Sequence, residues 1–157
     1  MNSNRRRLRK IGVIGSSRPS DHGLELAEQV GRLIACNGAL LICGGLGGVM
    51  EAASKGCAEA GGEVIGIVPG ADCSDVNPYV TICLPTNMGH ARNVIIAHAA
   101  DALVAIEGEY GTLSEIAISL KLGKKVVVLP GGQSVDGVLL AANPQLAVAM
   151  AMEQVES

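Results

Sequence analysis

Short apolar runs alternate along this chain with segments long enough to form helices, and this alternation restricts its fold more than any other feature. Parallel strands joined by crossover helices give such a pattern, because each helix returns the chain to the same end of the sheet. The sequence therefore predicts an α/β fold: a single-domain, Rossmann-like, three-layer structure with a mainly parallel sheet. The expected strands are Lys10–Gly15, Ala39–Cys43, Glu63–Val68, Val80–Leu84, Ala102–Ile106 and Lys125–Leu129, and the expected helices are Asp21–Cys36, Gly48–Ala60, Asn87–Ala99, Leu113–Leu122 and Pro144 to about Val155.

The composition favours a core of aliphatic side chains. Of the 157 residues 48% are hydrophobic, but only 1% are aromatic and neither Trp nor Phe occurs. Such a core suits a parallel sheet that is covered by helices on both faces. We expect one domain over residues 10–157, preceded by a basic N-terminal arm over residues 1–9. The arm is interpreted as a solvated end of the chain, with contact to an anionic ligand or to a neighbouring subunit as the alternative.

The charge and the lack of aromatic rings disfavour nucleic acid as a partner. The formal net charge is -3, whereas recruitment of nucleic acid requires a basic surface or rings on which bases can stack. No apolar run approaches the roughly 20 residues of a membrane span, and no signal peptide is recognisable. We therefore expect a cytoplasmic protein that contacts no membrane.

The cysteines and histidines show no spacing typical of a metal site. The chain has five cysteines and three histidines, without a C-x-x-C pair. Because the number of cysteines is odd and no such pair occurs, neither a disulfide framework nor a zinc site is indicated. Cys43 and Cys83 end strand-like runs and are expected to be small core residues. No metal and no required cofactor are expected.

Two glycine-bearing turns lead from an expected strand directly into an expected helix. Gly44–Gly48 follows the second strand, and Glu107–Gly111 follows the fifth. The free N–H groups at a helix N-terminus and the close approach that glycine permits suit both junctions to a phosphate group. The first turn has neither the dinucleotide-binding spacing G-x-G-x-x-G nor the P-loop ending G-K-[ST]. Its alternative interpretation is close packing of a strand against a helix.

Ligands of open parallel sheets bind at the carboxyl ends of the strands, near the point where the strand order reverses. This rule brings the loops after several of the strands together and predicts a phosphate-binding site. The polar segment Gly70–Pro78 is expected beside it as a loop that could close over the ligand. The expected ligand-binding residues are Gly15, Ser16, Ser17, Arg18, Gly44, Gly45, Gly47, Gly48, Met88, Arg92, Gly108, Gly111 and Thr112.

Arg92 and Glu115 are the candidate catalytic residues, and each has a structural alternative. The Arg92 guanidinium could clamp a phosphate group, or it could be an exposed helical side chain or a salt-bridge partner. Glu115 could act as a base or hold a ribose hydroxyl. Alternatively, Thr112 and Glu115 form a capping box of the pattern T-x-x-E, with Thr112 as the N-cap.

The same residues resemble the LOG-type, or lysine-decarboxylase-like, superfamily of Rossmann-like proteins. Its hallmark P-G-G-x-G-T-x-x-E corresponds to Glu107–Glu115, its upstream arginine to Arg92 and its glycine-rich loop to Gly44–Met50. The likeness extends over roughly Lys10–Leu129. Its best-known members are cytokinin-activating phosphoribohydrolases, which cleave a base from ribose 5′-monophosphate, so the resemblance implies a phosphate cradle.

Within that superfamily, Gly111–Ala117 and Leu120–Lys124 are most similar to a short subgroup. This subgroup is related to the DNA-processing protein A family and includes molybdenum cofactor carrier proteins. The resemblance implies an anionic, nucleotide-like or pterin-like ligand and assembly as dimers or tetramers. Glu107 and Glu109 stand where the superfamily usually has P-G-G, and two carboxylates disfavour a phosphate dianion unless they face solvent or an arginine.

Two functions fit these residues, and the sequence leaves open whether the protein is an enzyme. The first is binding of a phosphorylated nucleotide-like or pterin-like ligand, with a molybdenum cofactor carrier as the sharpest candidate. The alternative is a LOG-type phosphoribohydrolase that cleaves the N-glycosidic bond of a nucleoside 5′-monophosphate, with Glu115 stabilising the cationic ribose and Arg92 positioning the phosphate. A regulatory nucleotide sensor is a third candidate, which no feature of the sequence favours. The bound ligand would be a nucleoside monophosphate or molybdenum cofactor.

The apolar C-terminal segment predicts self-association. Leu139–Met152 is richer in apolar residues than one small domain is expected to cover. Exposed apolar faces of this kind commonly lie at subunit interfaces. We therefore expect a homo-oligomer, either a dimer or a tetramer.

Overall fold

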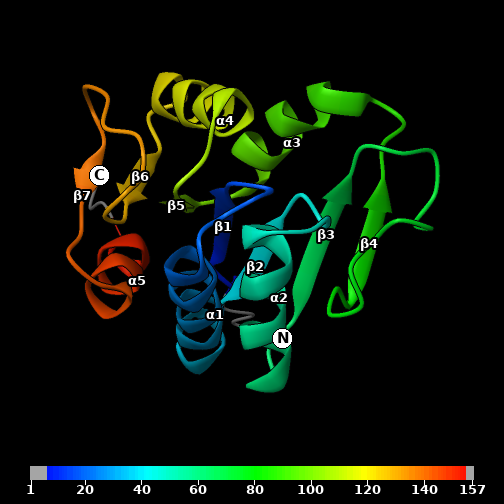
Figure 1. The fold of residues 1–157 in the computed structure, drawn as a ribbon, viewed down its shortest axis with the longest axis horizontal. Helices are drawn as coiled ribbons and strands as arrows, with labels where there is room; N and C mark the ends of the chain where they lie inside the picture. The colour runs from blue at the N-terminus through cyan, green and yellow to red at the C-terminus, as the bar shows by residue number, and fades with distance from the viewer. Residues whose placement is uncertain (1–6, 155–157) are drawn as a thin grey trace, which may run out of the picture.

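The computed structural model describes residues 7–154 and shows a sheet flanked by helices (Figure 1). The strands are β1 (Lys10–Gly15), β2 (Leu40–Cys43), β3 (Val64–Val68), β4 (Ile82–Pro85), β5 (Ala102–Ile106), β6 (Lys125–Val128) and β7 (Leu139–Leu140). The helices are α1 (Asp21–Cys36), α2 (Val49–Glu59), α3 (Arg92–Ala99), α4 (Tyr110–Lys121) and α5 (Pro144–Met152), and a short 3₁₀ turn, η1 (Gly89–Ala91), precedes α3.

All of the strands pair in parallel, in the order β4-β3-β2-β1-β5-β6-β7. The predicted single-domain, Rossmann-like α/β fold is therefore confirmed. After β1, the chain places β2, β3 and β4 on one side of it. It then returns and places β5, β6 and β7 on the other side. The strand order reverses between β1 and β5, where Gly15 lies opposite Ile106. This is the position at which open α/β sheets bind their ligands.

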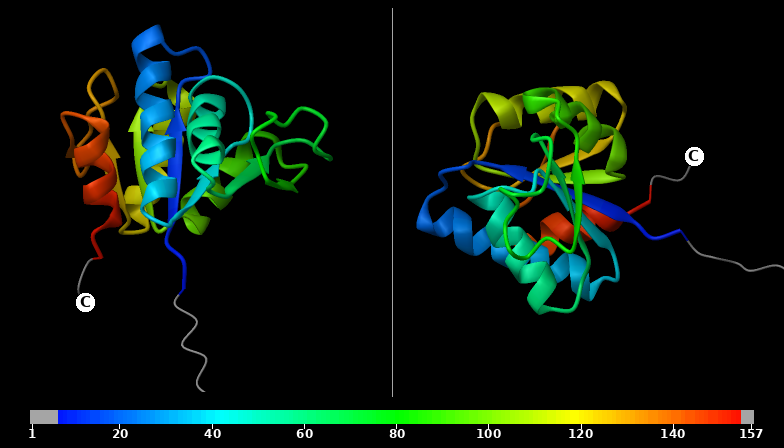
Figure 2. Two further views of the ribbon diagram at one scale, coloured as in Figure 1. Left: turned by 90° about the horizontal axis from the view of Figure 1, so that it is seen from below. Right: turned by 90° about the vertical axis from the view of Figure 1, so that its right-hand side faces the viewer.

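Helices cover both faces of the sheet (Figure 2). Two aliphatic core layers lie between the helices and the sheet. Helices α1, α2 and α5 pack on one face, and α3 and α4 pack on the other. Val13 and Leu41 belong to the first layer, and Ile96 and Leu103 belong to the second; all four side chains are fully buried. Burying such side chains stabilises the fold by about 1.5–3 kcal/mol each.

The glycine turn after β5 differs from the predicted capping box. Helix α4 begins at Tyr110, and Thr112 and Glu115 lie within it rather than at its start. Glu109 is the N-cap residue, and its side chain makes no capping hydrogen bond. The capping-box interpretation is therefore wrong, because the helix starts before Thr112, and the Glu115 side chain is not used to close the helix end.

A disulfide bond contradicts the prediction made for the cysteines. Cys73 and Cys83 form a disulfide bond, with their Cα atoms 6.3 Å apart. Cys83 is therefore not a core residue but joins the 70–78 loop to the edge strand β4. The loop brings the two residues together, and their sequence spacing carries no signal of this. Cys43 is buried, as expected.

The two ends of the domain are tied together at the amino ends of the strands. Arg9 donates a hydrogen bond to the carbonyl oxygen of Ala151 in α5, and Arg7 lies 3.7 Å from the Asp101 carboxylate. Residues 1–6 of the expected basic arm, and Val155 at the expected end of the last helix, lie outside the described residues. Within residues 7–154, no helix is both long enough and apolar enough to cross a membrane.

Candidate functional site

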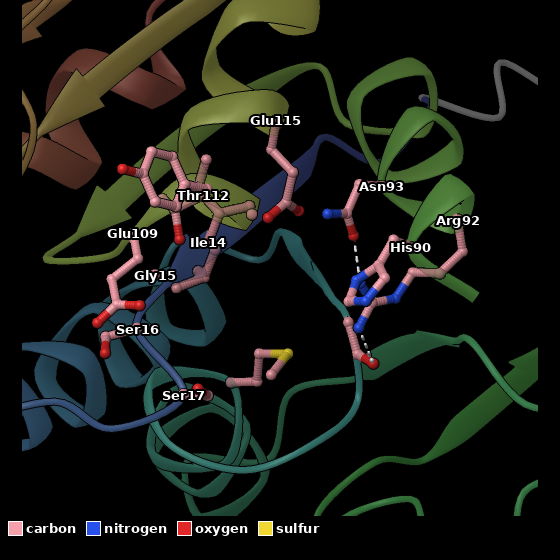
Figure 3. A pocket seen from close by; sticks show the side chains of 15 residues that line it. Ile14, Gly15, Ser16, Ser17, His90, Arg92, Asn93, Glu109, Thr112 and Glu115 are labelled. Carbon is pink, nitrogen blue, oxygen red and sulfur yellow. Dashed lines mark hydrogen bonds between the residues drawn. The ribbon is translucent and has the colours of Figure 1, made fainter.

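A cavity of about 250 Å³ opens at the carboxyl ends of β1, β2 and β5, beside the reversal of the strand order (Figure 3). Its wall combines backbone from two turns with polar side chains from α3 and α4. The lining residues are Val13, Ile14, Gly15, Ser16, Ser17, Gly44, Met50, His90, Arg92, Asn93, Glu109, Tyr110, Gly111, Thr112 and Glu115.

The N-terminus of α4 forms one side of the cavity. Tyr110, Gly111 and Thr112 line it, and the first hydrogen bond of the helix runs from the Leu113 N–H to the Glu109 carbonyl oxygen. The N–H groups of the three residues before Leu113 therefore have no partner within the helix. Together with the helix dipole, they suit this side of the cavity to an anion.

The loop after β1 forms the adjacent wall. A side chain at Gly15 would place its Cβ 2.2 Å from the carbonyl oxygen of Ile106, so the close approach of β1 and β5 requires glycine here. Ser16 and Ser17 line the cavity and offer hydroxyl groups. The Ser16 Oγ also accepts a hydrogen bond from the Arg18 N–H, whereas the Arg18 side chain is exposed and does not line the cavity.

The glycine-rich turn after β2 contributes less to the cavity than the sequence predicts. Only Gly44 lines it. Gly48 has a φ of 68°, and a Cβ there would lie 2.5 Å from the Ser16 carbonyl oxygen. That oxygen accepts the N–H of Val49 at the start of α2. Close packing against the β1 loop, the alternative interpretation, thus accounts for Gly48.

The remaining glycines and Met88 lie behind or beside the cavity. A Cβ at Gly45 would lie 2.6 Å from the Val68 side chain, and one at Gly108 would lie 2.4 Å from the Thr112 Oγ1. Gly47 has open space around it. Met88 is 48% exposed in the loop before η1. None of these four residues lines the cavity.

Arg92 is buried at the start of α3 and is bound to the ends of two strands. Its Nε donates a hydrogen bond to the carbonyl oxygen of Ile67 at 3.0 Å, and Nη2 donates to that of Gly44 at 3.4 Å. Nη1 donates to Oδ1 of Asn93. Burial lowers the pKa of Arg92, and the neighbouring Glu115 opposes this shift. The guanidinium group is thus held in a fixed position at the cavity wall.

Glu115 projects into the same cavity from α4. Burial raises the pKa of its carboxyl group to about 8, although the positive charge of Arg92 acts in the opposite direction. At neutral pH the ligand-free carboxyl group is therefore mostly protonated. None of the side-chain hydrogen bonds between residues 7 and 154 involves Glu115. A buried carboxyl group without such a bond is available to a ligand.

The two glutamates of the turn after β5 point in different directions. The Glu107 carboxylate accepts hydrogen bonds from the N–H and the hydroxyl of Ser20, at the start of α1. Glu109 is exposed and lines the cavity mouth. Of the two glutamates that replace residues of the P-G-G pattern, only Glu109 therefore lies where it would repel an anionic ligand.

Several lining residues carry little signal in the sequence. Asn93 is 5% exposed and stands beside Arg92 on the first turn of α3. His90 lies in η1, Met50 in the first turn of α2, and Tyr110 at the cavity mouth. Only the adjacency of Asn93 to Arg92 could have indicated that it belongs to the site. Within residues 7–154, no cluster of three or more His, Cys, Asp and Glu residues could hold a metal ion.

Comparison with solved structures shows where the same fold recurs. The molybdenum cofactor binding protein from the phototrophic bacterium Rippkaea orientalis is 34% identical, with a TM-score of 0.87 over 92% of this chain and 96% of that one. The molybdenum cofactor carrier protein from Chlamydomonas reinhardtii is 38% identical, with a TM-score of 0.84 and the same coverage of 92% and 96%. DNA processing protein A from Streptococcus pneumoniae, 20% identical with a TM-score of 0.76 over 95% of this chain and 63% of that one, shares the fold.

Comparison of sequences gives the family. An uncharacterized protein from Archaeoglobus fulgidus is 46% identical over 144 residues, which are 90% of this chain and 93% of the relative. The model of the SLOG cluster4 family matches residues 8–156. These matches and the fold of the carrier proteins confirm the resemblance to the LOG-type superfamily and its short subgroup: the chain belongs to the SLOG cluster4 family.

Proposed function

We propose that this protein binds molybdenum cofactor and carries it, rather than transforming it. The observation that carries the proposal is the composition of one cavity: N–H groups of a helix N-terminus on one side, and buried Arg92, Asn93 and Glu115 on the other. A phosphorylated pterin has a matching anionic end and a polar heterocyclic end. The solved structures at 34% and 38% identity, whose names state molybdenum cofactor binding or carriage, support this ligand.

In this proposal the phosphate group lies at the start of α4. Gly111 and Thr112 would donate N–H groups, and Ser16 and Ser17 would add hydroxyl donors from the β1 loop. Gly15 and Gly44 would let the ligand approach the backbone closely. Gly45, Gly47, Gly48 and Gly108 would shape the turns around it, whereas Arg18 and Met88 would contact a ligand only outside the cavity.

The heterocycle would lie between Arg92 and Glu115. The cavity of about 250 Å³ suits one small ring system and its phosphate better than a dinucleotide. Because the described residues offer no cluster of metal ligands, the protein would hold its cargo by the organic part and leave the metal to the ligand's own donor atoms. That arrangement suits a carrier, which must release its cargo unchanged.

A titration with the oxidised, fluorescent pterin of the cofactor tests where the phosphate binds. The phosphorylated form should bind at least about tenfold more tightly than the dephosphorylated form, because a charge-assisted set of hydrogen bonds contributes about 1.5–3 kcal/mol. Raised inorganic phosphate should compete with it. Equal affinity of the two forms would contradict phosphate binding at α4.

Hydrolysis of a nucleoside 5′-monophosphate is the second candidate function, and Glu115 favours it. A buried carboxyl group with a pKa of about 8, beside a fixed arginine, can exchange protons near neutral pH. Chromatography of mixtures with a panel of nucleoside 5′-monophosphates would detect a released base. Release that disappears in Glu115→Ala would establish hydrolysis, whereas no release at high protein concentration would leave the carrier function alone.

Self-association, as a dimer or a tetramer, belongs to the same proposal, and the C-terminal segment supplies part of the exposed apolar surface: Leu139, Leu140 and Leu146 are 41%, 65% and 45% exposed. Ala147, Val148 and Ala151 of α5 are buried within the chain's own core. By contrast, Ile82 and Leu84 on the edge strand β4 are 44% and 48% exposed. Sedimentation velocity should show an assembly larger than the 16.0 kDa chain, and a monomer at micromolar concentration would contradict it.

A further inference from the structure

The Asn93 carboxamide has a fixed orientation at the cavity wall. Its Oδ1 accepts a hydrogen bond from Arg92 Nη1, and a guanidinium group can only donate. This contact fixes the orientation of the amide group, so that Oδ1 faces Arg92 and Nδ2 faces away from it. Figure 3 shows the nitrogen directed toward the part of the cavity that Glu115 enters.

The two N–H donors of Asn93 Nδ2 are available to a ligand. None of the side-chain hydrogen bonds within residues 7–154 uses this atom, although the side chain is 5% exposed. A Cβ added at Gly111 would lie 4.0 Å from Nδ2, which places the donor beside the first turn of α4. A ligand that displaces water from this part of the cavity would therefore have to offer an acceptor to this donor.

Glu115 provides the complementary acceptor. Glu115 is 8% exposed and lines the same cavity. At least one carboxyl oxygen can accept a hydrogen bond whether the group is protonated or ionised. A donor from Asn93 and an acceptor from Glu115 therefore stand next to each other in the cavity.

We propose that Asn93 and Glu115 together recognise a cyclic amide edge, in which a ring N–H stands next to a ring carbonyl group. Asn93 Nδ2 donates to the carbonyl oxygen of the heterocycle, and Glu115 accepts the ring N–H. This inference rests on the proposed function, since it names the part of the ligand that enters the same cavity. The site selects oxo-heterocycles, such as 4-oxopteridines and 6-oxopurines, over amino counterparts that exchange the donor and the acceptor.

Arg92 acts in this selection as a positioning residue. It acts on the recognised edge through Asn93, whose amide would otherwise be free to rotate and present its oxygen instead of its nitrogen. Its hydrogen bonds to the Ile67 and Gly44 carbonyl oxygens fix the guanidinium group itself. The specificity of the cavity thus depends in part on Ile67, at a strand end that does not line the cavity.

Inosine 5′-monophosphate and adenosine 5′-monophosphate are suitable probes. They share ribose, phosphate and the purine rings, but inosine carries an N–H next to a carbonyl group where adenosine carries a ring nitrogen next to an amino group. Isothermal titration calorimetry of the full chain should show tighter binding of the inosine nucleotide by about tenfold or more. The adenosine nucleotide would leave the Asn93 donor and the Glu115 acceptor without partners in the complex. Unpaired buried polar groups lower binding affinity by about this factor.

Variants at the helix α3 separate recognition from folding. Asn93→Asp keeps an acceptor for Arg92 but replaces the amide donor with a second acceptor, so the preference for the inosine nucleotide should disappear or reverse. The matched control is Val94→Ala, because Val94 is 40% exposed on the next position of α3 and lies outside the cavity. It should keep the preference of the unmodified protein. Circular dichroism checks that both variants fold.

Three results would overturn the inference: equal affinity for the two nucleotides, tighter binding of the adenosine nucleotide, or no binding of either at millimolar concentration. An unchanged preference in folded Asn93→Asp would do the same. Failure of the proposed function gives a different result. If the protein retains molybdenum cofactor but binds the two nucleotides equally, only the edge recognition is wrong. If it prefers the inosine nucleotide but does not retain the cofactor, only the carrier function is wrong.

Discussion

Nε of Arg92 donates a hydrogen bond to the carbonyl oxygen of Ile67, at 3.0 Å. The arginine at the centre of the candidate site is therefore also a link between the start of α3 and the carboxyl end of β3. The binding role that we propose for it and its structural role both depend on the same fixed position. The two roles can be separated by comparing stability with ligand affinity in the same variants.

Arg92→Ala should destabilise the fold as well as weaken ligand binding. It leaves the carbonyl oxygens of Ile67 and Gly44 without their donor in a buried place. We expect a loss of about 2–4 kcal/mol in the free energy of unfolding, measured by urea denaturation. Arg92→Lys should lose less, because one ammonium group can still donate to one of the two oxygens. Unchanged stability in Arg92→Ala would show that these hydrogen bonds contribute nothing.

The pH dependence of stability should depend on Glu115. Its pKa is raised from 4.5 to about 8 in the folded protein, so the protonated form is favoured by folding. The stability linked to this group is fully present below pH 4.5 and is lost as the pH rises through 8. Glu115→Gln cannot ionise, so at high pH its free energy of unfolding should exceed that of the unmodified protein by about 4–5 kcal/mol, at roughly 1.4 kcal/mol per pKa unit.

Urea denaturation of ligand-free protein at pH 5 and at pH 9 measures this difference. The two proteins should have similar stability at the lower pH and diverge at the higher one. Parallel pH curves would show that the Glu115 carboxyl group is not displaced from its ordinary pKa.

Substitution of the two glutamates after β5 by alanine should affect different properties: stability for Glu107 and ligand affinity for Glu109. Glu107→Ala removes the acceptor for the Ser20 N–H and hydroxyl, so it should cost about 0.5–1.5 kcal/mol of stability. Glu109→Ala should leave stability nearly unchanged, because the side chain is exposed. It should instead raise the affinity for a phosphorylated ligand about two- to fivefold, and less so at high salt.

Paired measurements of thermal unfolding and ligand affinity at two salt concentrations test this contrast. Tighter binding in Glu107→Ala and not in Glu109→Ala would mean that the wrong carboxylate has been assigned to the cavity mouth.

The disulfide bond between Cys73 and Cys83 should stabilise the loop beside β4. It closes a loop with a sequence separation of 10, for which loss of chain entropy in the unfolded state gives about 2–3 kcal/mol. Cys83→Ser, or a dithiol reductant, should therefore lower the unfolding temperature. Cys36→Ser is the matched control, because Cys36 is exposed and free. A non-reducing peptide map that lacks the Cys73–Cys83 link would contradict the bond directly.

Much of the fold could be predicted because its apolar runs are long and strongly patterned. The observed β1, β5 and α1 have the predicted bounds, Lys10–Gly15, Ala102–Ile106 and Asp21–Cys36. The sequence does not predict the short strand β7, Leu139–Leu140, because two residues are too few to show the hydrophobic alternation of a strand. It exists because they pair with Val127 and Val128 at the sheet edge.

The sequence predicts those parts of the site that depend on where helices start and strands end. It does not predict those that depend on contacts between residues far apart in the chain. The sequence placed Arg92 and Glu115 together, since their helices begin at the same end of the sheet. Nothing local indicates that Asn93 is oriented by its neighbour or that Glu107 turns toward Ser20. The sequence predicts the glycines at 45 and 48 as ligand contacts, whereas the structure shows close packing against Val68 and Ser16.

The most direct test of the carrier function is retention of the intact cofactor. The protein would be incubated without oxygen with molybdenum cofactor released from a molybdoenzyme, and unbound cofactor would be removed by gel filtration. Molybdenum in the protein fraction would be measured by mass spectrometry, and pterin by fluorescence after oxidation. We expect both to elute with the protein in equal amounts, and the bound amount to saturate as more cofactor is added. Folded protein that retains neither component would contradict this expectation.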